Sequence, residues 1–560
     1  MRSVHSSLPI RLLFMQLSLR SVSICILLIG LSSAAVRAQQ PPNNPQAQNF
    51  QRAAIAPPGA QQNPLFAGPN VGPNANLGAN GRPRGAAANA DFDSLIDLIE
   101  STVANDTWSQ NGGGQADIRP FPGGVLVDAA GVLRLRSRAS NNHSDAAKDL
   151  ARDLAALRGT APPVVAQSGK SSRASRLRYV SLPRLEREIV RRQAAHQRLD
   201  PAMLTLAGLQ RVRYIFAYPE TGDVVLAGPA GDWFVDKDGH ILSADSHEPV
   251  VRLDDLLTIW RRGAEAADSH FGCSINPRQE SLAKTQAFLA ASSKKPLEPS
   301  HRKQWLSDLR DCVGRQDIDI FGIDPTSRVA SVLVEADYHM KLIGMGLADG
   351  VDGVESYLQS IHLRSGESPP PMSVLRWWFA LKYDAIAHSE TRDAFELVGQ
   401  GVRVLSENEL LAEQGQRVHT GASDPLNRQF AQSFTSHFDA LAKKYPVYGE
   451  LRNIFDLAMA VALIQTEDLP ERVHWKPTLL ASGDKLRLPH RRPPREVETV
   501  INHRVINQRF VIAGVSGGVM VAPGDVLRAT KAMDSTDKTI QRAAPGPKEL
   551  AAGAWWWDAQ

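Results

Sequence analysis

Hydrophobic and polar positions divide this 560-residue chain into stretches of very different character. Within the first 38 residues, a basic start with no acidic residue precedes an apolar run from Val22 to Leu31, and small residues around Ala38 follow it. This order is typical of a secretory signal peptide. The run is too short for a membrane-spanning helix, which needs ~20 apolar residues, and no later run is long enough. We therefore expect residues 1–38 to be removed and the mature chain to have no transmembrane span.

Residues 39–90 show no periodic apolar pattern. Of these 52 residues, 31 are Pro, Asn, Gln or Gly and another 12 are Ala. A segment with so little apolar surface does not offset the entropy lost on ordering. We predict a disordered tail that serves as a spacer between the export signal and the folded part of the chain.

Residues 91–160 carry the first periodic pattern. Apolar positions in 92–100 fit one face of a helix, and 144–158 fits a second helix that is closed by Gly159. Between them, Gly124–Val127 is expected to pair with Val132–Leu135 across a turn that contains glycine. The pattern predicts a small α+β module.

The segment 177–405 mixes helical and strand patterns. A helix near 182–197 is followed by four short apolar runs, which are separated by Gly, Pro and Asp turns. These runs predict an antiparallel β-meander, and they are 211–218, 223–227, 233–235 and 240–242. Further strands are expected at 317–321, 329–334, 394–398 and 402–405. The segment reads as the main α+β domain.

The last third of the chain changes character twice. Asp424-Pro425 is a helix start, and the apolar spacing over 424–466 predicts a helical hairpin whose second helix is buried. Strand-like runs at 510–513 and 517–521 and a Trp-rich tail at 555–557 place a β segment in 496–560. We expect the tail to pack on the core, with stacking on sugars as the alternative. The fold class is α+β and multi-module.

Charge adds one local signal. The chain has 63 Lys+Arg against 59 Asp+Glu, and the predicted signal peptide removes four arginines, so the mature chain is formally neutral and gives no argument for nucleic acid. Residues 131–215 carry 17 basic and 6 acidic side chains. Arg184, Arg187 and Arg191 share a helical face in this stretch. The preferred interpretation is a solvated helix face, and the alternative is a surface for an anionic envelope polymer or an acidic partner.

Only two cysteines, Cys273 and Cys312, remain after the predicted cleavage. An exported protein meets an oxidising compartment, where such a pair forms a disulfide. Two separately buried thiols are the alternative.

Three short motifs carry weak chemical signals. Gly514–Gly518 matches G-x-S-x-G, but no histidine follows Ser516, so a tight β-turn is preferred to a nucleophile elbow. Gly344–Gly350 is interpreted as a helix exit and not a dinucleotide loop. Asp236–Gly239 is interpreted as a hairpin turn and not a calcium loop. We predict no catalytic residue, cofactor or metal site.

Five runs carry a resemblance to known sequences: RVRYIFAYPETGDVVLAGPAGDW (211–233), FGCSINP (271–277), RVASVLVEADYHMKLIGMGL (328–347), YPVYGELRNIFDLAMAVALI (445–464) and VINHRVINQRFVIAGVSGGV (500–519). They resemble an uncharacterised family of exported proteins from planctomycete bacteria, a domain of unknown function. LIDLIESTVANDTWSQNGGG (95–114) is similar to a module of planctomycete exported proteins and faintly to secretin N-terminal domains. The resemblance implies export to the periplasm or cell envelope and implies no reaction.

Taken together, the residues and the resemblance predict an exported cell-envelope protein that acts as a binding or structural component. The alternative is an envelope enzyme, hydrolase-like, whose carboxylates no spacing reveals. Converging carboxylates in a deep cleft would favour the enzyme, and a flat basic surface would favour the binding protein.

Overall fold

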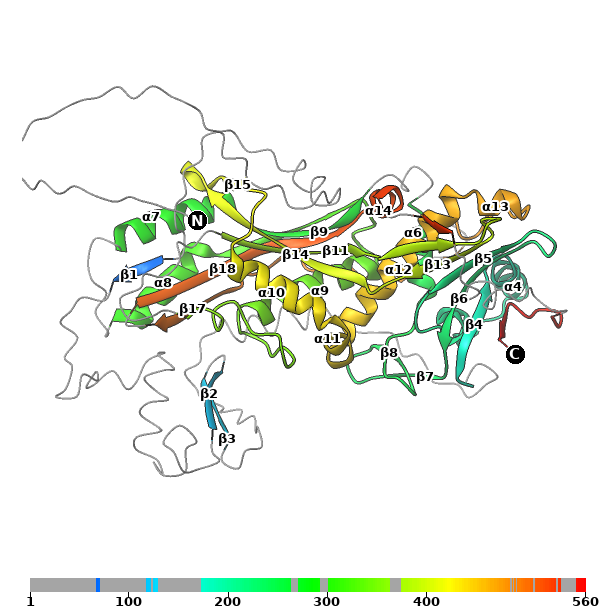
Figure 1. Cartoon of the computed structure of the whole chain (residues 1–560), viewed down its shortest axis with the longest axis horizontal. Helices are drawn as coiled ribbons and strands as arrows, with labels where there is room; N and C mark the ends of the chain where they lie inside the picture. The colour runs from blue at the N-terminus through cyan, green and yellow to red at the C-terminus, as the bar shows by residue number, and fades with distance from the viewer. Residues whose placement is uncertain are drawn as a thin grey trace, which may run out of the picture. The chain divides into compact units, whose positions relative to one another are not determined.

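The computed structural model describes part of the chain, and Figure 1 shows it. The described residues are 67–70, 117–121, 124–128, 173–262, 270–292, 301–362, 374–483, 486, 488–489, 491–506, 509–529, 532–534 and 550–559. The predicted signal peptide and nearly all of the predicted tail lie outside them.

The larger sheet has nine strands and is built around one long strand, β18. Its order is β15-β14-β11-β18-β9-β10-β16, and β1 and β17 also pair with β18. The strands are β1 (Ala67–Asn70), β9 (Phe271–Pro277), β10 (Arg315–Phe321), β11 (Val374–Lys382), β14 (Gly401–Leu411), β15 (Arg417–His419), β16 (Glu496–Glu498), β17 (Ile501–Ile506) and β18 (Arg509–Val521). All neighbours are antiparallel except β11 and β18, which are parallel.

The smaller sheet has seven strands in the order β19-β12-β13-β5-β6-β4-β20. These are β4 (Ser175–Ser181), β5 (Tyr214–Tyr218), β6 (Asp223–Ala230), β12 (Ala385–His388), β13 (Ala394–Val398), β19 (Ala532–Asp534) and β20 (Trp556–Asp558). Two hairpins stand apart as separate sheets, β2 (Asp117–Phe121) with β3 (Gly124–Asp128) and β7 (Trp233–Val235) with β8 (Ile241–Ser243). Strands from 177–405 and from 496–560 therefore share both large sheets.

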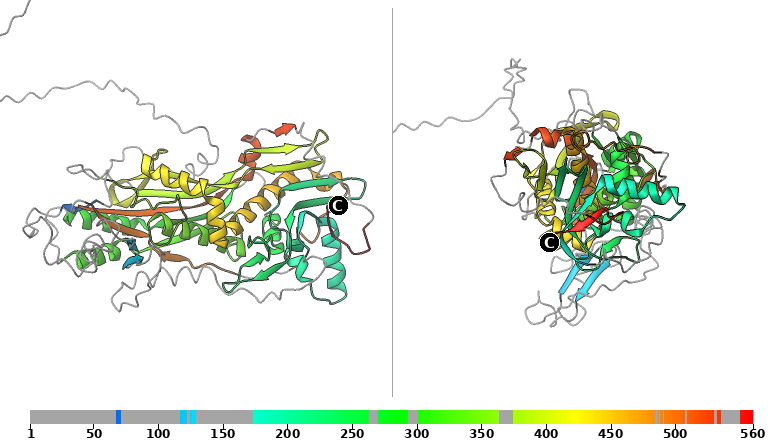
Figure 2. Two further views of the ribbon diagram at one scale, coloured as in Figure 1. Left: turned by 60° about the horizontal axis from the view of Figure 1, so that its bottom comes forward. Right: turned by 90° about the vertical axis from the view of Figure 1, so that its right-hand side faces the viewer.

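Helices cover the larger sheet and join it to the smaller one (Figures 1 and 2). The α-helices are α4 (Leu182–Ala194), α5 (Pro201–Leu204), α6 (Leu253–Trp260), α7 (Gln279–Ser292), α8 (Arg302–Val313), α9 (Arg328–Gly344), α10 (Pro425–Ser436), α11 (Phe438–Lys444), α12 (Pro446–Thr466), α13 (Leu469–Arg472) and α14 (Pro523–Ala529). One continuous core contains side chains of both sheets and of α4, α6, α9, α10 and α12.

Capping side chains explain several helix starts. Ser327 Oγ accepts the backbone N–H of Ala330 at the start of α9, and Asp424 Oδ1 accepts that of Asn427 at the start of α10. At the other end of α9, a Cβ on Gly344 would lie 2.2 Å from the Trp377 ring, so only glycine lets α9 approach β11 this closely.

The predicted α+β class is confirmed. The individual elements agree with the prediction in part. All four meander strands are found, but β7 and β8 form a separate two-stranded sheet. Strand β6 therefore pairs with β5 and with β4, and not with β7. Gly124–Val127 is a strand as predicted, and it pairs with β2. Its predicted partner Val132–Leu135 and the predicted helices at 92–100 and 144–158 lie outside the described residues. Residues 329–334, predicted as a strand, belong to α9. Ala67–Asn70, inside the predicted tail, pair with β18.

The helical hairpin lies where it was predicted. Its first part is broken at His437 into α10 and α11. The second helix, α12, has every residue from Val447 to Ile464 buried. An all-round apolar pattern of this kind is expected of a helix in the centre of a core.

Candidate functional site

Helix α9 is the most unusual polar feature of the described structure. All 17 of its residues are buried, and five of them have acidic or basic side chains: Arg328, Glu335, Asp337, His339 and Lys341. Removing a charge from water costs several kcal/mol unless a partner compensates it. The partners of these side chains therefore define the candidate site.

The first group lies at the N-terminal end of α9. Arg328 Nη1 lies 2.5 Å from Asp255 Oδ2 on α6, and Arg328 Nη2 lies 2.5 Å from Glu450 Oε1 on α12. The same Glu450 oxygen lies 3.1 Å from His240 Nδ1, which follows the turn between β7 and β8. We call these four residues the Arg328 cluster. It joins three helices and a hairpin that are far apart in the sequence.

Burial and charge shift the pKa values within the Arg328 cluster in opposite directions. Burial raises the pKa of Asp255 to about 6, with a contribution from the neighbouring Asp254 carboxylate, although Arg328 opposes the shift. Burial acts on Glu450 in the same sense, but Arg328 and His240 outweigh it and lower the pKa of Glu450. Glu450 in turn raises the pKa of His240 against the effect of burial. The cluster therefore holds one carboxyl that protonates easily beside one that does not.

The second group lies further along α9. Lys341 Nζ lies 2.6 Å from Asp337 Oδ2, and both side chains are fully buried. Lys341 also donates to the carbonyl oxygen of Ile275, at 3.3 Å. Burial lowers the pKa of Lys341 and raises that of Asp337, so each loses part of its preference for the charged form. This pair fixes α9 against strand β9.

A third polar group crosses the larger sheet on β11, β14, β15 and β18. Arg376 Nη1 lies 2.7 Å from Glu407 Oε2, and His419 Nδ1 lies 3.2 Å from carboxylate oxygens of both Glu407 and Glu409. Ser516 Oγ donates to Glu409 Oε2 at 3.0 Å. Burial raises the pKa of Glu407, but His419 and Arg376 outweigh it and lower the pKa overall. These contacts link side chains of the strands β11, β14, β15 and β18.

Ser516 shows why G-x-S-x-G is not a nucleophile elbow here. It lies in the middle of β18, fully buried and bonded to Glu409. The preferred interpretation as a tight turn is also wrong, because β18 continues through the motif. A Cβ on Gly517 would lie 1.6 Å from the Trp377 carbonyl oxygen, so the glycine permits close strand pairing. After β18, Pro523 begins the helix α14.

The three predicted arginines of α4 have different surroundings. Leu182, Leu185 and Ile189 are fully buried, which places the apolar face inward. Arg187 is exposed, and among the described residues no ion pair is found for it. The side chain of Arg191 is 59% exposed, but Glu188 accepts two hydrogen bonds from it.

Arg184 differs from both, because it donates two hydrogen bonds of 2.8 Å to the buried carboxylate of Asp223. These bonds outweigh burial and lower the pKa of Asp223. Arg184 therefore has a structural role as the partner of a buried carboxylate. Of the three arginines, Arg187 and Arg191 are the ones that face solvent.

The predicted disulfide is not present in the structure, where Cys273 and Cys312 are both free. Cys273 is fully buried on β9, beside Lys341 and Asp337, and burial raises the pKa of its thiol well above the ordinary value. Cys312 lies half-buried on α8, near Lys284 and two aspartates. Different elements hold the two thiols, so the alternative of separate thiols describes the structure, with only Cys273 fully buried.

The remaining motifs agree with their preferred interpretations. α9 ends at Gly344, and Gly346 adopts a φ of 70°, as in a helix exit. Asp236 Oδ1 accepts the backbone N–H groups of Asp238 and His240, which closes a hairpin turn. Trp555 is 5% exposed and joins the core, so the Trp-rich tail packs on the protein.

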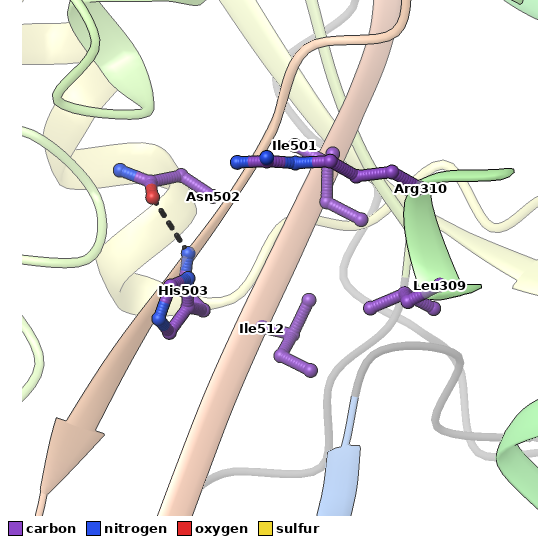
Figure 3. Close-up of a pocket in the computed structure, with 6 residues that line it drawn as sticks. All are labelled: Leu309, Arg310, Ile501, Asn502, His503 and Ile512. Atoms are coloured by element: carbon purple, nitrogen blue, oxygen red, sulfur yellow. Dashed lines mark hydrogen bonds between the residues drawn. The ribbon is translucent and has the colours of Figure 1, made fainter. Parts of the chain in front are cut away.

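A hollow with room for about one water molecule lies between α8 and strands β17 and β18. Figure 3 shows it with Arg310, Asn502 and His503 among its lining side chains. In the described part of the chain, no group of three or more His, Cys, Asp or Glu side chains could hold a metal ion. No helix of that part could cross a membrane.

Sequence reasoning missed the Arg328 cluster because 329–334 was predicted as a strand. The signal was present, since five residues with acidic or basic side chains interrupt an apolar run at 328–343. Arg328 and Glu335 are seven positions apart, and Glu335/His339 and Asp337/Lys341 are each four apart, which are helical intervals.

Comparisons with known proteins identify one segment. A family model described as a protein of unknown function (DUF1598) matches residues 273–357, which run from β9 through α9. The match includes Cys273, Arg328, Asp337 and Lys341, whereas Asp255 and Glu450 lie outside it. Neither a curated protein nor a solved structure matches the chain. Over residues 273–357 the chain is thus similar to a family whose activity is not known.

Proposed function

We propose that this chain is an exported cell-envelope protein that binds an anionic partner through the outward face of α4. The observation that carries the proposal is the exposure of Arg187 and Arg191 opposite a fully buried apolar face of the same helix. Exposed guanidinium groups interact with carboxylates and phosphates. The partner is a carboxylate-rich or phosphate-rich envelope polymer, or an acidic protein.

The charge on this face is local. Glu188 accepts hydrogen bonds from both Arg191 and Arg192, so this group of three carries a net charge of +1. Arg187 adds a second positive charge one turn earlier on the helix. Arg184 adds none, because Asp223 neutralises it. The proposed contact is therefore weak and sensitive to salt.

Export rests on the basic start, the apolar run and the small-residue exit of residues 1–38. Cell fractionation followed by N-terminal sequencing tests it. The proposal requires the protein in the envelope fraction, with a first residue near Gln39 and release by a salt wash. A protein that still begins at Met1 in the cytoplasm would exclude export.

One observation favours the alternative of a hydrolase-like enzyme. The adjacent carboxyls of Asp254 and Asp255 have pKa values shifted in opposite directions, because burial acts on both and Arg252 offsets it at Asp254. Such divergence is typical of acid and base pairs in active sites. Asp255 is only 2% exposed, however, so substrate access would need an opening movement. An Asp255→Asn variant that degraded isolated envelope material as fast as wild type would remove this alternative.

A further inference from the structure

The C-terminal strand β20 occupies the outer edge of β4, whose other edge pairs with β6. Trp556, Trp557 and Asp558 pair with Val180, Tyr179 and Arg178 in turn. Two further backbone bonds extend the pairing, from Ser181 N–H to the Trp555 carbonyl oxygen and from Ala559 N–H to that of Leu177, both at 2.9 Å. The strand therefore has a defined register over its whole length.

Each side chain of this strand also has its own contact. The Trp557 ring stacks on Tyr179 with centroids 5.3 Å apart and planes 8° apart. Arg178 donates to both carboxylate oxygens of Asp558, at 2.7 and 3.1 Å, and its guanidinium lies 4.4 Å from the centroid of the Trp556 ring. Trp555 enters the core. The edge of β4 thus recognises an aromatic sequence that ends in an acid.

The recognition site is organised by bonds that do not involve the strand. The fully buried Arg178 also donates to the carbonyl oxygens of Ala207, at 2.6 Å, and of Arg173, at 2.7 Å. Without a carboxylate beside it, a buried arginine is costly. An exposed strand edge is also a template for pairing with another chain.

The position of β20 in the chain allows exchange. The strand before it, β19, lies at the opposite edge of the same sheet, and residues 535–555 connect the two. Among the described strands β20 pairs with β4 alone, so its departure would break no other strand pairing. The same contacts would form if the strand came from another copy.

We infer that the β4 edge also accepts the Trp555–Asp558 strand of a second copy of this chain, so that two molecules exchange their C-terminal strands. Exchange of an identical element creates no new contact surface and is a low-cost route to a dimer. It is favoured at high protein concentration, because the tethered strand of the same chain competes with it.

Mixing two pools of the full chain, one with a polyhistidine tag and one with a streptavidin-binding tag, tests this inference. Both tags belong at the N-terminus. After incubation at high concentration, the second pool should be recovered with the first on a nickel matrix. A peptide with the sequence of residues 551–560 should compete, and its Trp557→Ala, Asp558→Asn form should compete at least about tenfold less well.

Controls separate exchange from other association. Pools that both lack residues 551–560 should not be recovered together, and an Asp558→Asn full chain should exchange less, which covers the case that the truncated chain fails to fold. Recovery that survives the truncation would overturn the inference. Peptide binding to the truncated chain without exchange between full-length pools would overturn it as well, since only the chain's own tail would then fill the site.

Discussion

Arg328 and Glu450 form an ion pair of 2.5 Å between the first turn of α9 and α12, and both side chains are at most 7% exposed. Replacing a buried pair by apolar residues often costs little stability, whereas removing one partner costs much. We therefore infer that the pair acts mainly to specify how α9 sits against α12 and α6.

Replacement of Arg328 by methionine should be strongly destabilising. It leaves the Asp255 and Glu450 carboxylates buried without their cation, and the expected loss is about 3–5 kcal/mol. Urea denaturation measures it. The matched control is Arg213→Met, which removes a 49% exposed arginine paired with Glu396 and should cost less than about 1 kcal/mol. Equal losses in the two variants would contradict the account.

Stability should depend on pH in a defined direction. The pKa values of Asp255 and His240 are higher in the folded protein than in the unfolded chain. At a pH between the unfolded and the folded pKa of each group, the folded state therefore binds more protons. The contribution of Asp255 is complete below its ordinary pKa of 3.8 and is lost as the pH rises to about 6, whereas that of His240 is complete below its ordinary value of 6.5 and is lost as the pH rises above it. Glu450 has a lowered pKa and contributes above its unfolded value, and this part is lost in acid.

The free energy of unfolding should therefore fall as the pH rises from about 6.5 toward 8, and His240→Gln should flatten this fall, whereas Asp255→Asn should change the profile between about pH 4 and 6. Chemical denaturation at fixed ionic strength across this range provides the measurement. A wild-type profile that rises from pH 6 to pH 8 would be inconsistent with the cluster.

Gly344→Ala should destabilise the protein by roughly 1–3 kcal/mol, because the new methyl group would meet the Trp377 ring and Phe430. Gly483→Ala is the control, since no atom lies within 4 Å of its Cβ position, and it should stay within about 0.5 kcal/mol of wild type. Thermal unfolding of both variants compares them. A Gly344→Ala variant as stable as Gly483→Ala would show that α9 and β11 separate easily.

Replacing different arginines of α4 should change the free energy of unfolding by different amounts. Arg184→Met leaves the buried Asp223 carboxylate without its bidentate partner and should cost about 2 kcal/mol or more. Arg187→Met should be within about 0.5 kcal/mol of wild type. The comparison is made by urea denaturation, and losses of the same size would mean that Arg187 has a structural partner. A binding test should accordingly leave Arg184 unchanged.

Local sequence signals predicted several parts of the fold. Leu182, Leu185 and Ile189 point inward on α4 because their spacing is helical and their side chains are apolar. Asp424-Pro425 begins α10 because both residues suit a helix start. These features depend on neighbours in sequence.

Features that depend on contacts between distant segments could not be predicted from local sequence. Residues 510–513 and 517–521 were predicted as two strands because the Gly514–Gly518 motif was interpreted as a turn, yet they belong to one strand, β18, in which Gly517 and Gly518 permit close backbone contacts. The Arg328 cluster depends on α6 and α12, whose positions no local pattern specifies. The Asp117–Phe121 strand could have been found from the Pro122-Gly123 dipeptide, a frequent hairpin turn.

The proposal that α4 binds an anionic partner is tested most directly by charge reversal at one exposed position. Arg187→Glu and Lys237→Glu change the net charge equally, and the Lys237 side chain is 89% exposed on the β7–β8 turn. Retention on immobilised polygalacturonate in a salt gradient is measured for both. The account predicts that Arg187→Glu elutes at clearly lower salt than wild type and that Lys237→Glu elutes close to wild type. Equal elution of the two variants would contradict it.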